Sequence, residues 1–153
     1  MTKLSQCIDQ LEKKIILHEK INLAVSQATI GWHIDHSLLV INGIVSQLKN
    51  SNPNQYKWRF NLSRFYIQTI NKIPRGKGKA PKIVQPTETT STDGLIAKLE
   101  LAKKNSHELE SLDPKCYFAH PYFGNLNVKK SIWFLELHTK HHLKIIEDIS
   151  LNP

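Results

Sequence analysis

The chain has 153 residues, 40% of them hydrophobic and 22% charged, which is typical of one globular domain and excludes a disordered or fibrous chain. No apolar run approaches the roughly 20 residues that a membrane span needs, and the first residues lack the apolar stretch of a secretory signal. Two isolated cysteines cannot form a disulfide framework. We therefore expect a single cytoplasmic domain over residues 1–153, with reduced thiols and no membrane partner.

The net charge of +8 comes from one part of the chain. No acidic residue lies between Asp35 and Glu88, and this window holds nine of the 21 Lys and Arg residues. The other 12 basic residues are balanced by 13 acidic ones, so the rest of the chain is nearly neutral. A segment of this kind is typical of a phosphate-binding surface or of a solvated loop.

Helical periodicity accounts for most of the chain, because apolar residues recur every three or four positions. It predicts four main helices, at 3–18, 27–49, 92–112 and 128–149, with Ser26 as cap of the second and Thr92 or Asp93 as cap of the third.

The part between the second and third main helices is less regular. Apolar spacing predicts a short helix within 57–72, and three prolines and two glycines make 73–86 an irregular connection. No run with a period of two predicts a strand, and 120–124 is expected to be a loop. The predicted fold is all-α: a four-helix bundle with a long basic crossover at about 73–92.

Two histidines on the last helix are the strongest candidates for chemistry. On a helical wheel His138 and His142 fall one turn apart in the middle of the inward apolar face, with His141 at its edge. Two imidazoles that point into an apolar core are costly unless a partner satisfies them, and a divalent metal does so. Position 139 is Thr, so the His-Glu-x-x-His motif of zinc proteases is absent. A third ligand must come from another helix.

The second helix offers two candidates for that ligand, His33 and His36. His33 lies nearer the main apolar stripe of the helix, whereas His36 shares a second apolar strip with Trp32 and Leu39. Periodicity does not choose between them.

Three blocks that contain these histidines resemble the DinB/YfiT-like superfamily of metalloenzymes. They are Trp32-His-Ile-Asp-His36-Ser-Leu, His120-Pro-Tyr-Phe-Gly124 and His138-Thr-Lys-His-His142-Leu. The basic crossover, Pro74-Arg-Gly-Lys-Gly-Lys-Ala-Pro-Lys82, is also similar to that of a DinB-like branch to which no function is assigned. The resemblance extends from about Leu4 to Ile149, and only these blocks are specific.

The resemblance implies a bundle, often a homodimer, with a three-histidine site for nickel or zinc. Its ligands here would be His36, His138 and His142, so the resemblance chooses His36 over His33. Three protein ligands leave one coordination position for water or substrate. Several relatives act with low-molecular-weight thiols, which implies metal-dependent transfer of such a thiol to a small electrophile, with the metal-held thiolate as nucleophile. The expected enzyme is thus a thiol S-transferase or a hydrolase of small electrophiles, and no residue is assigned as the catalytic acid or base.

Other residues are expected near this site. The basic crossover could orient an anionic co-substrate, unless it is only a solvated loop, and its candidates are Arg75, Lys77, Lys79 and Lys82. Four residues could support the ligands from behind, namely His33, His120, Tyr122 and His141, although the block from His120 to Gly124 could equally be a turn that leads into the last helix.

Two alternatives to an enzyme stay open at this point. The protein could be a bundle that holds a metal without catalysis. It could also bind nucleic acid through the basic segment 49–82, which is interleaved with aromatic residues such as Trp58 and Phe65. Nucleic-acid binding is the less favoured of the two, because no such motif is present and the aromatic residues are expected to cover the bundle.

Overall fold

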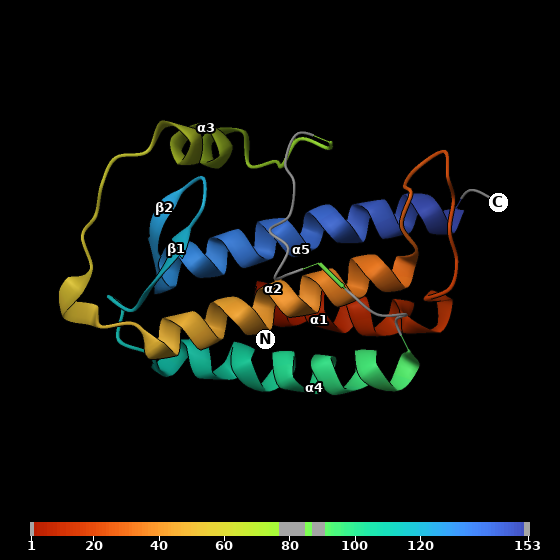
Figure 1. Ribbon diagram of the computed structural model, residues 1–153, viewed down its shortest axis with the longest axis horizontal. Coiled ribbons are helices and arrows are strands. Elements are labelled where there is room, and N and C mark those ends of the chain that lie inside the picture. The colour runs from red at the N-terminus through yellow and green to blue at the C-terminus, as the bar shows by residue number, and fades with distance from the viewer. Residues whose placement is uncertain (1, 77–84, 87–90, 152–153) are drawn as a thin grey trace.

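The computed structural model describes residues 2–76, 85–86 and 91–151, and most of them are helical (Figure 1). The elements in chain order are α1 (Lys3–Lys14), η1 (Ile15–Leu17), α2 (Ile30–Asn50), η2 (Pro53–Gln55), α3 (Leu62–Ile70), α4 (Thr92–Glu108), η4 (Leu109–Ser111), β1 (Tyr117–His120), β2 (Gly124–Asn127) and α5 (Val128–Leu151), where η marks a 3-10 turn. No described helix is both long and apolar enough to cross a membrane.

The prediction of an all-α four-helix bundle is wrong. The described residues form five α-helices and a two-stranded antiparallel sheet, whose strands flank the predicted loop at 120–124 and were not predicted. Phe118 pairs with Leu126 and His120 with Gly124, and Phe118 and Leu126 are both buried. Each strand has only four residues, which is too short for an alternating pattern to stand out in the sequence. Gly124 has a φ of +69°, which suits glycine at the end of the turn.

The long helices α1, α2, α4 and α5 lie side by side, and α1 and α5 run opposite to α2 and α4 (Figure 1). The hairpin lies at the end of this body where α5 begins, and α3 lies beside the hairpin on the outside. One apolar core joins the long helices to the hairpin, with Ile34 and Leu38 of α2 and Leu135 and Ile146 of α5 among its buried members. The inward face predicted for the last helix is therefore confirmed.

The predicted helix boundaries need small corrections, each with a local cause. α2 begins at Ile30 because Thr29 is its cap and accepts a hydrogen bond from the Trp32 backbone nitrogen at 3.1 Å. Ser26, the predicted cap, lies in the preceding loop. In the same way Ser91 caps α4, in place of Thr92 or Asp93.

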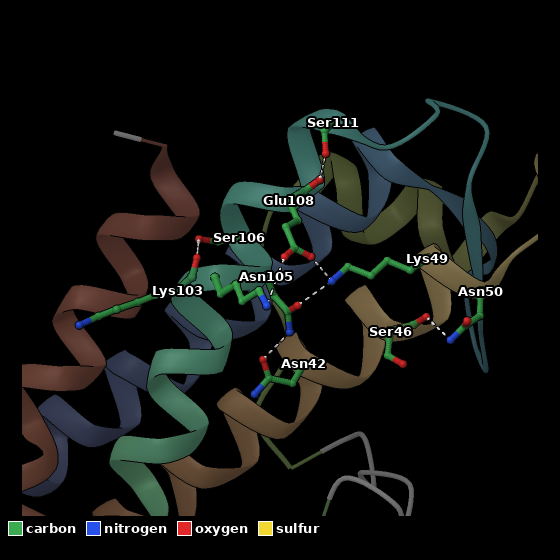
Figure 2. Close-up of polar contacts among 10 residues, drawn as sticks. Asn42, Ser46, Lys49, Asn50, Lys103, Asn105, Ser106, Glu108 and Ser111 are labelled. Carbon is green, nitrogen blue, oxygen red and sulfur yellow. Dashed lines mark hydrogen bonds and ion pairs between the residues drawn. The ribbon is translucent and has the colours of Figure 1, made fainter.

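Polar contacts between α2 and α4 hold these two helices in one register (Figure 2). Asn105 donates to the side-chain oxygen of Asn42 at 2.9 Å, and Lys49 donates to that of Asn105 at 3.0 Å and pairs with Glu108. Nearer the start of α2, Asp35 accepts from Lys98 at 2.6 Å. Asp35 thus faces α4. His33 is two residues before Asp35 and His36 is one residue after it, so both face α5 instead.

α3 is tied to the hairpin by side-chain hydrogen bonds, one of them from a buried arginine. The guanidinium of Arg64 is buried and donates to the Phe123 carbonyl at 3.0 Å, and Asn61, the cap of α3, donates to the Tyr122 carbonyl at 3.1 Å. Ile67 packs against the core, whereas the aromatic side chains of Trp58, Phe60, Phe65 and Tyr66 are exposed. The expectation that they cover the bundle is therefore wrong.

Two glycines of α2 provide a test of how tightly this helix is seated. A Cβ at Gly31 would lie 2.9 Å from the backbone oxygen of His18, whereas a Cβ at Gly43 would meet nothing within 4 Å. We expect Gly31→Ala to lower the free energy of unfolding by about 1–3 kcal/mol, because the close approach of α2 to η1 must give way. Gly43→Ala should raise it by about 0.5–1 kcal/mol, because alanine favours a helix. Urea denaturation measures both, and equal effects would contradict the packing described.

Candidate metal centre

Three histidines from two helices meet in the interior of the molecule. His36 of α2 and His138 and His142 of α5 each offer one ring nitrogen, and these nitrogens all lie within 4.8 Å of one another. Nε2 of His36 is 3.2 Å from Nε2 of His138. His36 and His142 are buried, and His138 is partly exposed at its edge. Ring nitrogens gathered in this way could hold a single metal ion.

The surroundings favour the neutral form of His138 and His142. Burial, together with the neighbouring histidines, holds the pKa of His138 and the pKa of His142 well below the usual value. Asp35 is the acidic residue nearest to His36 in the sequence, but its carboxylate accepts a hydrogen bond from Lys98 on the other side of α2. Neutral imidazole is the form that binds a metal, so the site is prepared for one at neutral pH.

The donor set fits a divalent transition metal. The short distance between the Nε2 atoms of His36 and His138 brings two ring nitrogens to one spot, where their lone pairs repel unless a proton or a cation lies between them. Imidazole nitrogens suit zinc, nickel, copper and iron better than magnesium or calcium, which prefer oxygen.

His33 lies behind the cluster rather than in it. Its Nδ1 is 3.0 Å from Nδ1 of His142, and its Nε2 is 3.0 Å from the hydroxyl of Ser26. Burial, and next the charge of His36, lower the pKa of His33 to about 4, so this ring is neutral too. The consistent assignment has Nδ1–H of His142 donating to His33 and Nε2–H of His33 donating to Ser26. Nε2 of His142 is then the nitrogen left for a metal, and a hydrogen-bonded partner behind a ligand is usual in metal sites.

Three residues of the site were not singled out from the sequence. The indole of Trp32 is stacked on the His36 ring, with centroids 5.1 Å apart and an angle of 16° between the planes. The Phe134 ring lies 5.6 Å from that of His138, and Ser26 holds His33. The signal for Trp32 and Phe134 was their spacing, since each stands four positions before a ligand on the same helix.

The described part of the crossover passes over α5 beside the cluster. The His141 ring donates to the carbonyl of Ile73, and Arg75 forms an ion pair with Asp148 at 2.6 Å. Burial, and then the nearby charge of Arg75, lower the pKa of His141. Arg75 is therefore the predicted substrate-binding residue that the structure brings near the histidines. Lys77, Lys79 and Lys82 lie outside the described residues.

His120 and Tyr122 belong to the hairpin and not to the cluster. Nδ1 of His120 accepts from the backbone nitrogens of Tyr122 and Phe123, at 3.1 Å each, and its ring is stacked on that of Phe123 with centroids 4.2 Å apart. Tyr122 is exposed. Between the two predicted roles for this block, these contacts favour a turn that leads into α5.

Comparison with known proteins adds no assignment. No family model matches the chain, and no curated protein or solved structure matches it. The resemblance to the DinB/YfiT-like superfamily thus rests on the histidine blocks and the basic crossover of the sequence alone.

The contact between His33 and His142 can be tested by substitution of His33. We expect His33→Leu to weaken binding of Zn²⁺ or Ni²⁺ by about 10- to 100-fold, because His142 loses the group that sets its tautomer and orientation. His33→Asn should retain most of the affinity, since its amide oxygen can accept from His142 near the position of Nδ1. Titration calorimetry of the metal into the metal-free protein measures both. Unchanged affinity in His33→Leu would show that the contact has no such role.

A second prediction uses the pH dependence of stability. Burial lowers the pKa of folded His120 to about 4, against 6.5 for an unperturbed histidine. The unfolded chain therefore binds more protons between these values, and the contribution of His120 to stability, complete above pH 6.5, is lost as the pH falls towards 4. His120→Asn keeps an acceptor for the turn but does not titrate. We expect this variant to lose less stability than the wild type between about pH 7 and about pH 5, measured by urea denaturation in a chelator. Parallel losses would contradict the assignment.

Proposed function

We propose that the protein is a divalent-metal-dependent enzyme that transfers a low-molecular-weight thiol to a small electrophile. The observation that carries this proposal is the cluster of His36, His138 and His142, a set of three imidazoles without a carboxylate. Nickel and zinc are the ions proposed, because both accept nitrogen ligands of this kind.

The number of ligands favours catalysis over a purely structural role. Structural zinc sites are closed by four protein ligands, whereas three protein ligands leave a position for a molecule from outside. When bound, such an ion lowers the pKa of a thiol or of water and so supplies a nucleophile at neutral pH. The choice of a thiol over water follows from the resemblance to the DinB/YfiT-like superfamily.

The surrounding residues have separate roles in this proposal. His33 and Ser26 orient His142, and Trp32 covers one face of His36 and limits access of water there. Arg75, on the crossover beside the cluster, is placed to receive a carboxylate of the co-substrate in exchange for Asp148. Low-molecular-weight thiols derived from cysteine carry such a carboxylate. A homodimer, which the resemblance also implies, is part of the proposal.

The metal site is tested by metal analysis of protein purified without a histidine tag. We expect a stoichiometric divalent ion in the wild type, and at least a tenfold loss of affinity for Zn²⁺ and Ni²⁺ in His36→Ala and His142→Ala. His107→Ala is the matched control, because this histidine is exposed on α4. Protein that binds neither ion, or ligand variants that bind as well as the control, would overturn the proposal.

The reaction is tested on the metal-loaded protein with a panel of small thiols and electrophiles. Thiol consumption should require the metal, and Arg75→Gln should raise KM for a carboxylated thiol about tenfold while a thiol without a carboxylate is unaffected. Tight metal binding with no turnover of any pair would refute the enzyme and leave a metal-binding protein.

A further inference from the structure

A second surface of the molecule is unlike the rest. Among the described residues, 14 large hydrophobic side chains are exposed, and six of them lie within the 13 positions from 58 to 70. Their exposed fractions run from 40% to 72%, and they are Trp58, Phe60, Leu62, Phe65, Tyr66 and Ile70. We call these six residues the α3 patch. A concentration of exposed apolar groups on this scale is typical of an interaction site.

The fold holds the α3 patch outwards. Leu62, Phe65, Tyr66 and Ile70 are spaced by three, one and four positions, which places them on one side of α3. Arg64, on the other side of the helix, is buried against the hairpin, where its guanidinium donates to the Phe123 carbonyl. α3 therefore lies on the outside of the molecule, beside the hairpin and away from α1 and α4 (Figure 1). This amphipathic helix turns its apolar side to the surroundings.

Within the described part of the chain, the recess at the α3 patch has no second element as a wall. The recess found at this helix is lined by Leu62, Ser63, Phe65, Tyr66 and Thr69, which all belong to α3. A peptide or helix that docks on a protein is normally held between two walls. A single apolar side that projects from the surface is instead suited to entering an apolar layer, such as the acyl-chain region of a lipid membrane.

Unbalanced positive charge surrounds the α3 patch. Lys57, Arg59 and Lys72 are exposed next to it in the chain, and none of the three has an ion-pair partner within the described ranges. Two further cations, Lys129 and Lys130, begin α5 nearby, and burial together with the charges of Arg64 and Lys129 lowers the pKa of Lys130. No acidic residue lies between 35 and 88 to offset them. The complementary partner is therefore anionic, and a second copy of the same surface would be repelled.

We propose that the α3 patch docks the protein on an anionic lipid surface. The apolar side of α3 enters the boundary between head groups and acyl chains, and Lys57, Arg59 and Lys72 meet the acidic head groups. Trp and Tyr favour this boundary, where one end of the ring is apolar and the other wet. The expectation of no membrane partner rested on the lack of a spanning segment, which has no bearing on a helix that lies on the surface.

Single-stranded nucleic acid is the main competitor, and two observations disfavour it. Leu62 and Ile70 are aliphatic and offer no face on which a base could stack. The ring of Trp58 has the guanidinium of Arg64 at 6.0 Å from its centroid, so one of its faces is already in use.

Sedimentation with vesicles tests the proposal on the full chain. We expect at least about tenfold stronger partition into vesicles with roughly one third phosphatidylserine than into pure phosphatidylcholine, and a decrease on adding salt. The fluorescence of Trp58 should shift to the blue on binding, and Trp58→Phe should remove that shift. Equal or absent partition into the two kinds of vesicle would overturn the proposal.

Matched variants separate the α3 patch from general hydrophobicity. Leu62→Ser with Phe65→Ser should reduce partition about tenfold, because both side chains are largely exposed in the free protein and leave the core intact. Ile96→Ser with Leu101→Ser is the control, since these residues are exposed on α4 at 45% and 48%. An equal loss in both double variants would overturn the proposal.

Two further measurements test the other occupants. Anisotropy of a labelled oligonucleotide should show no binding that depends on Leu62 and Phe65. Light scattering should show an oligomeric state that is the same in Leu62→Ser with Phe65→Ser as in the wild type. The proposal would be overturned if the oligonucleotide bound through the α3 patch while vesicles did not bind. It would also be overturned if the double variant dissociated an oligomer.

Discussion

The rotation of α2 about its own axis is the constraint on which the histidine cluster depends. Asp35 is held by Lys98, and Asn42 and Lys49 are held by Asn105, so one side of α2 is committed to α4. A turn of about 100° per residue then directs His36 towards α5, with His33 beside it. If α2 were rotated by one residue, the ring nitrogens of His36 and His138 would no longer meet.

The cluster carries a cost that a metal can offset. Three imidazoles gathered without a carboxylate give up much of the hydration of their nitrogens, and the lowered pKa values of His138 and His142 reflect this loss. An ion that binds the folded chain and not the unfolded one stabilises the fold by mass action. Metal binding and the stability of the contact between α2 and α5 are therefore linked. The neighbouring contacts, from His33 to Ser26 and from Trp32 to His36, hold the rings in place whether or not a metal is bound.

The basic segment separates into cations with different roles. Lys49 forms an ion pair with Glu108, and Arg75 forms one with Asp148. Arg64 is buried between α3 and the hairpin and donates to the Phe123 carbonyl. These three serve the fold or the edge of the metal centre. Lys57, Arg59 and Lys72 stay exposed around the apolar side of α3. Among the described residues of the basic window, the unpaired cations thus lie around α3, whereas Arg75 lies beside the histidines.

Periodicity alone determined the long helices and the inward position of His138 and His142, because an apolar stripe with a period of 3.6 residues reports which side chains share a face. It did not distinguish His36 from His33, since both lie on faces of α2 that are buried. Only the packing of α2 on α5 decided this, by bringing Nε2 of His36 to His138 and Nδ1 of His33 to the far side of His142. The hairpin and the outward side of α3 were likewise decided in three dimensions. A sequence pattern records that a face is apolar, but whether that face meets the core or the surroundings depends on contacts, such as those of Arg64, between residues far apart in the chain.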